Sequence, residues 1–104
     1  MSSLINLSLS GNDLHNKVID FSKLTNLRNL SLLNCSLWSE DLEKLKTLKN
    51  NTNLVINLSN NAIVDATALL ELNPNTRIDL TGNVNLSQDS KDKLKTRFGD
   101  NVKF

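Results

Sequence analysis

The feature that most constrains this chain of 104 residues is a short leucine phrase that recurs four times. The most complete copy runs from Leu4 to Leu14 and follows the pattern Leu-x-x-Leu-x-Leu-x-x-Asn-x-Leu. The second copy, from Leu27 to Leu37, has a cysteine in the asparagine position, and two looser copies follow. The anchors of the four copies are spaced 23, 26 and 22 residues apart: Asn12, Cys35, Asn61 and Asn83. A repeat of this length indicates stacked units that share one continuous core.

The alternation inside each phrase predicts a short parallel strand in every unit. Successive side chains of a strand point to opposite faces, so the leucines face the core and their neighbours face the other side of the sheet. After each strand the anchor side chain turns inward, where an asparagine can bond backbone groups that would otherwise be buried and unpaired. The four anchors are therefore predicted to form a structural ladder.

The segments between the strands predict different return paths. Residues 16–27 indicate an irregular or short helical return. The second return predicts a helix with Ser39 as its N-cap and a buried stripe of Leu42, Leu45 and Leu48. The third return predicts a short helix with Asp65 as its N-cap. It ends before a proline, because the residue that precedes proline disfavours helix.

The two ends of the repeat array differ. Ser87 predicts the start of a helix that buries Leu94 and Phe98 and ends at Gly99, followed by a short strand. We therefore expect repeats over residues 1–86 and a C-terminal cap over residues 87–104, since a terminal unit must cover the last core residues. At the other end a full phrase begins at Leu4, which predicts an exposed strand edge. Either further repeats upstream or another surface would cover it.

These residues resemble the leucine-rich repeat superfamily over roughly positions 4–86. The first two phrases match at every specified position, whereas Asn53 and Asn75 replace the opening leucine of the third and fourth. The resemblance implies an α/β fold, namely a short right-handed solenoid with a parallel sheet on its concave face. It also implies a non-enzymatic protein-binding module, because known members mostly bind proteins through that face. Because the repeats differ in length, the resemblance does not indicate a subfamily.

The phase of the leucines identifies the residues on the predicted concave face. Binding hot spots are enriched in Trp, Tyr and Arg, and this face offers a single arginine among small polar side chains. The predicted partner-binding residues are Asn29, Ser31, Leu33, Asn57, Arg77 and Asp79. A solvated face without a partner is an equally weighted alternative.

Three single residues invite a chemical interpretation. Trp38 is either an exposed anchor for a partner or, as we prefer, a residue packed over the following helix start. Cys35 occupies an inward-facing ladder position, which favours a buried structural thiol over a nucleophile. His15 is expected to be an exposed loop histidine, and one histidine with one cysteine on another unit cannot complete a zinc site. We expect no catalytic site, no metal and no cofactor.

Composition narrows the choice of partners. The net charge is +1, from 12 basic and 11 acidic residues, so no strong field directs the chain to nucleic acid. Membrane insertion is not expected, because no apolar run approaches roughly 18 residues. The sequence does not indicate the cellular compartment of the protein. Two alternatives to partner binding remain: self-assembly through the N-terminal edge, giving a homo-oligomer, and substrate recognition for a larger enzyme or effector.

Overall fold

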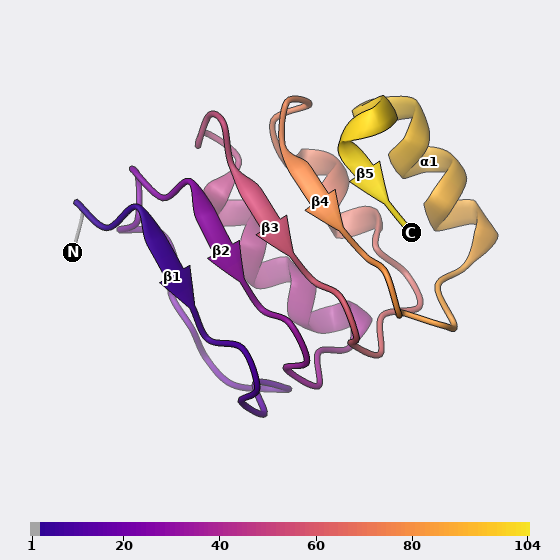
Figure 1. The fold of residues 1–104 in the computed structure, drawn as a ribbon, viewed down its shortest axis with the longest axis horizontal. Coiled ribbons are helices and arrows are strands. Elements are labelled where there is room, and N and C mark those ends of the chain that lie inside the picture. The colour runs from indigo at the N-terminus through magenta and orange to yellow at the C-terminus, as the bar shows by residue number, and fades with distance from the viewer. Residues whose placement is uncertain (1–2) are drawn as a thin grey trace.

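The computed structural model describes residues 3–104, which form one five-stranded parallel sheet with its strands in sequence order (Figure 1). The strands are β1 (Asn6–Ser8), β2 (Asn29–Ser31), β3 (Val55–Asn57), β4 (Arg77–Asp79) and β5 (Val102–Lys103). This confirms the predicted α/β class with a parallel sheet of short strands. The arrangement is consistent with a small repeat solenoid.

The register of the sheet aligns equivalent positions of the repeated phrase. Leu7 pairs with Leu30, Leu30 with Ile56, and Ile56 with Ile78. These central residues point into the core, and the residues on either side of each point away from it. The predicted alternation therefore holds in every repeated strand.

The helices lie behind the sheet and leave its other face uncovered (Figure 1). They are the 3-10 helices η1 (Ser39–Leu48) and η2 (Thr67–Glu71), the α-helix α1 (Gln88–Phe98) and the short 3-10 helix η3 (Gly99–Asn101). The first return, within residues 16–27, contains turns and irregular segments but no helix. The predicted leucine stripe of η1 is buried in the core between helices and sheet. We call the uncovered side the open face.

Two predicted helix starts are wrong by one residue. Trp38, not Ser39, is the N-cap of η1, and Ser39 Oγ accepts the backbone N–H groups of Val64 and Asp65 instead. A hydroxyl that bridges to the next unit is unavailable to its own helix. Ala66 is the N-cap of η2, and Asp65, one residue earlier, accepts the backbone N–H of Thr67, the first residue of that helix.

The C-terminal end is covered as the sequence predicts. Ser87 Oγ accepts the N–H of Ser90 and begins α1, which buries Leu94 and Phe98 against the core. Gly99 follows with a φ of 58°, a left-handed conformation that glycine adopts without strain. The chain then adds β5 beside β4.

The N-terminal end is less well covered. We use "rung" for one strand with the loop that follows it. On the first rung Leu7, Leu9 and Leu14 are only half-buried. Their counterparts on the second rung, Leu30, Leu32 and Leu37, are 2%, 3% and 4% exposed. The outer edge of β1 and one side of its leucines are thus open within residues 3–104.

The departure of the third phrase from the repeat pattern at Asn53 is accompanied by a change in the backbone before β3. Asn53 adopts a φ of 57°, and this turn brings Leu54 into the core directly before β3. Thr76 occupies the equivalent buried position before β4. Its Oγ1 has no hydrogen-bond partner among the described residues. The rungs therefore differ in how they enter the strand, whereas their strands keep one register.

Candidate functional site

The strand register arranges the open face as rows of side chains that cross the sheet. One row contains Asn6, Asn29, Val55 and Arg77, and a second contains Ser8, Ser31, Asn57, Asp79 and Lys103. Five of the six predicted partner-binding residues belong to these rows. The sixth, Leu33, lies two residues beyond the end of β2 and is half-buried. The structure thus brings most of the predicted site onto one surface.

The N-terminal half of this face is a network of uncharged side chains that bond one another. Asn29 Nδ2 donates to Asn6 Oδ1 at 2.6 Å. Ser31 Oγ and Ser10 Oγ are also 2.6 Å apart, and Ser8 Oγ donates to Ser10 Oγ. A shallow hollow of about 460 Å³ lies over this half. Several of its polar atoms are therefore bonded to one another without a ligand.

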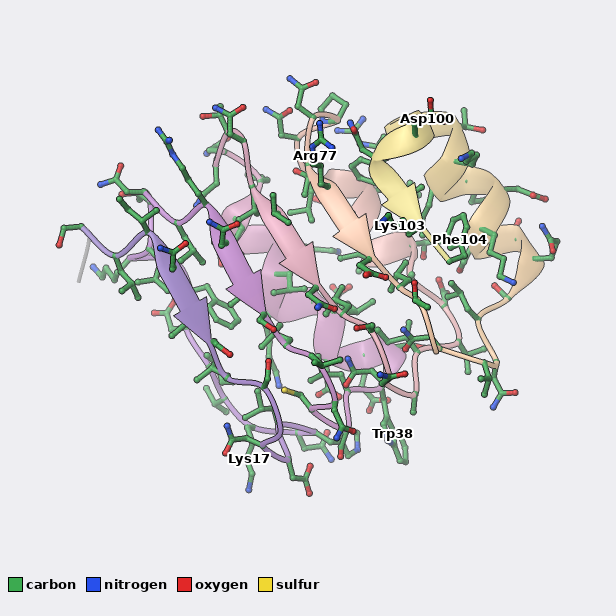
Figure 2. All side chains as sticks on the ribbon, viewed as in Figure 1. Lys17, Trp38, Arg77, Asp100, Lys103 and Phe104 are labelled. Carbon is green, nitrogen blue, oxygen red and sulfur yellow. The ribbon has the colours of Figure 1, made fainter. Side chains whose placement is uncertain are left out.

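The C-terminal half of the open face carries charge. A hollow of about 260 Å³ is lined by Val55, Arg77, Asp79, Asp100 and Lys103. Figure 2 shows Arg77 and Lys103 on the neighbouring strands β4 and β5, with Asp100 just before β5. Val55 is 41% exposed and provides apolar surface beside the charges. This half is the more chemically distinctive part of the face.

The ladder residues bind consecutive rungs together on the core side. Asn61 Oδ1 accepts the N–H groups of Cys35 and Leu37 on the preceding rung, at 2.9 and 3.0 Å. Its Nδ2 donates to the carbonyls of Leu32 and Leu58. Asn83 repeats the pattern by accepting from Ile63 and donating to Leu58.

The other two ladder positions make fewer bonds. Cys35 is buried, and its Sγ donates to the carbonyl of Leu9 at 3.2 Å. A thiol held in this way has a structural role, as its position in the repeat suggests. Asn12 on the first rung is exposed, and its Nδ2 donates only to the carbonyl of Leu9. Its side-chain oxygen has no partner within residues 3–104, because no preceding rung is present there.

The clearest surprise is a polar cluster around Asp41. His15 was expected to be exposed, but its ring is largely covered and its Nδ1 lies 2.7 Å from Asp41 Oδ2. Asp41 is buried and also accepts the N–H groups of Asn16 and Trp38. Lys44 Nζ donates to the same carboxylate at 3.3 Å.

The cluster changes the acidity of its carboxylate. Burial alone raises the pKa of Asp41, but hydrogen bonds from His15, Trp38, Asn16 and Lys44 outweigh that effect and lower the pKa from 3.8 to about 2. The carboxylate therefore stays charged and ties the first loop to the start of η1. No local pattern in the sequence predicts this contact, because Asn16 and His15 precede Asp41 by 25 and 26 residues.

Trp38 combines parts of both predicted roles. Its ring stacks on the His15 ring, with centroids 4.0 Å apart, directly before η1 begins. It remains 51% exposed. Figure 2 shows it at the edge where the chain leaves the strands, away from Arg77 and Lys103. Trp38 is therefore separate from the open face.

Within residues 3–104, no group of three or more His, Cys, Asp or Glu side chains could hold a metal ion. The His15–Asp41 pair brings an imidazole and a carboxylate into hydrogen-bond distance, and the buried Cys35 thiol donates to the carbonyl of Leu9 instead. No helix in this part of the chain has the length and apolar character that crossing a membrane requires.

Comparisons with known proteins assign no relative. No protein-family model, curated protein or solved structure matches the chain. The function of the chain is therefore inferred from the geometry of its open face.

Sequence reasoning missed two residues of that face, Asp100 and Lys103. Both lie in the segment interpreted as a cap. The signal for Lys103 was present, because it alternates with the buried Val102 as the outward residues of the other strands alternate with their leucines.

Proposed function

We propose that this chain is a leucine-rich repeat solenoid that binds a protein partner through its open face, without catalysis. The observation that carries the proposal is the set of in-register rows on a face that no helix covers. Each row presents side chains at the spacing of neighbouring strands, about 4.8 Å. Such a surface is complementary to an extended protein segment or to a protein surface with protruding side chains. The recurring leucine phrase supports the assignment to the superfamily.

A matched pair of variants tests this function by affinity capture from the source cells. Val55→Arg places a long charged side chain in the middle of the open face, where the valine is 41% exposed. Val84→Arg makes the same change in the loop after β4, where the valine is 89% exposed. We expect the Val55 variant to lose a partner that the intact chain and the Val84 variant retain. Equal capture by all three proteins would contradict the proposal, provided that circular dichroism shows them folded.

A second candidate function is self-assembly through the first rung. The half-buried leucines of this rung and the free side-chain oxygen of Asn12 occupy positions that a further rung would cover. Two copies related by a two-fold axis can pair their β1 edges in antiparallel orientation. Asn6 and Ser8 would then face each other across the axis and exchange hydrogen bonds.

Light scattering over a range of concentrations tests self-assembly. We expect the apparent mass to rise from 11.6 kDa towards twice that value as the protein is concentrated. A constant monomer mass up to millimolar concentration would eliminate this candidate and would leave partner binding untouched.

A further inference from the structure

The two halves of the open face differ in how far their polar groups are already satisfied. In the N-terminal half, the side chains of Asn29, Ser31 and their neighbours bond one another. A partner would have to replace these bonds, so the net gain from each would be small. In the C-terminal half, neither Arg77 nor Lys103 has an ion-pair partner among residues 3–104. The unpaired charge of this half is therefore mainly cationic.

We propose that the partner places an acidic side chain, next to an apolar one, in the hollow between Arg77 and Lys103. The inference rests on the proposed function and specifies which part of the face the partner contacts. The class of partner is a protein segment that presents an aspartate or glutamate at its surface.

The backbone geometry lets the two cations reach one carboxylate. Lys103 is in register with Asp79, two residues along β4 from Arg77. One strand spacing combined with two residues of rise separates the Cα atoms of Arg77 and Lys103 by roughly 8 Å. Both side chains are longer than half that distance and exposed, and both line the same hollow. An arginine can also bind a carboxylate through two parallel hydrogen bonds.

Two acidic residues, Asp79 and Asp100, also line the hollow. Asp79 Oδ1 accepts the backbone N–H of Thr81, but the carboxylate has no ion-pair partner among residues 3–104. Asp100 lies 3.8 Å from Lys95 on α1, and both side chains are exposed. The hollow therefore holds two unpaired cations and one unpaired carboxylate, so an acidic partner gains more charge pairing there than a basic one. Val55 supplies the apolar contact beside the two cations.

A peptide titration followed by NMR of the labelled protein tests the proposal directly. The probe is acetyl-Gly-Leu-Asp-Gly-amide, and its control carries Asn in place of Asp. We expect the Asp peptide to shift the amide signals of Asn57, Arg77 and Lys103 at millimolar concentration and the Asn peptide to bind about tenfold more weakly.

Charge-reversal variants locate the binding site. Arg77→Glu and Lys103→Glu are each expected to weaken binding of the Asp peptide about tenfold. Arg28→Glu makes the same charge change directly before β2, outside the hollow, and should leave the affinity within about twofold. Should either charge reversal prevent folding, Arg77→Gln and Lys103→Gln remove the cations with less perturbation and are expected to weaken binding in the same direction.

The outcomes separate this inference from the function on which it rests. Equal binding of the Asp and Asn peptides, or an equal loss in the Arg28 variant, would overturn the acidic-partner proposal. If capture of the cellular partner is lost in Val55→Arg but normal in Arg77→Glu and Lys103→Glu, the inference fails and the proposed function stands. If none of these variants alters capture, the proposed function fails as well.

Discussion

Replacing Asn61 with alanine is expected to lower the free energy of unfolding by about 4 kcal/mol, a large part of the stability of a domain of this size. The side chain accepts two backbone N–H groups of the second rung and donates to the carbonyls of Leu32 and Leu58. All four bonds are buried. Alanine would leave these backbone groups without partners, and each orphaned buried group costs about 1–3 kcal/mol.

Asn12→Ala is the matched control for this prediction. Asn12 holds the same position on the first rung, but it is exposed and makes one hydrogen bond, to the carbonyl of Leu9. Its removal should cost less than about 1 kcal/mol. Chemical denaturation of both variants gives the comparison. Similar losses for the two would mean that the ladder does not hold the rungs together through side-chain hydrogen bonds.

The second large effect is expected at Asp41, where Asp41→Asn should destabilise the protein by about 3 kcal/mol at neutral pH. The buried carboxylate accepts hydrogen bonds from Trp38 and Asn16, and His15 Nδ1 lies 2.7 Å away. An amide cannot accept all of them, and its own N–H₂ group would face donors. Glu40→Gln removes a negative charge from the same turn of η1, where the side chain is exposed, and should cost about 0.5 kcal/mol.

The pH dependence provides an independent check on Asp41. Its pKa is lowered from 3.8 to about 2 by folding, so the charged carboxylate stabilises the native state fully above pH 3.8. This contribution, about 2 kcal/mol from the size of the shift, is lost as the pH falls towards 2. Unfolding followed from pH 6 to pH 2 should therefore show the gap between the intact chain and Asp41→Asn narrowing below pH 3.8. A gap that stays constant would contradict the assignment.

The sheet was predictable from the sequence because the repeat phrase acts locally and recurs. A leucine at every second position fixes which face of the strand is buried, and equal phase in successive copies fixes the register. The cap was predictable for a similar reason, since Ser87 and Gly99 are local signals at the ends of one helix. The helix type was not, because the difference between an α-helix and the 3-10 helices η1 and η2 depends on packing against the next rung.

Which residues share the open face was predictable from the sequence, but their hydrogen bonds were not. The phase of the leucines placed Asn29, Asn57 and Arg77 on one face. Whether a polar side chain there is free or bonded to its neighbour depends on rotamers and distances across strands, which no pattern encodes. The Asp41 cluster was missed because a buried aspartate in an acidic helix start has the same sequence signature as an exposed one.

Because strand order equals chain order, each rung is supported mainly by the rungs before and after it, and within residues 3–104 β1 pairs with β2 alone. Such an array can fray. The first rung can open as a local unit while the later rungs remain closed, since little of their core is contributed by it. Arg77 and Lys103 lie at the far end of the sheet from β1. A partner bound there would remain bound through fluctuations that expose the first strand. Local unfolding of the first rung and binding at β4 and β5 are therefore compatible.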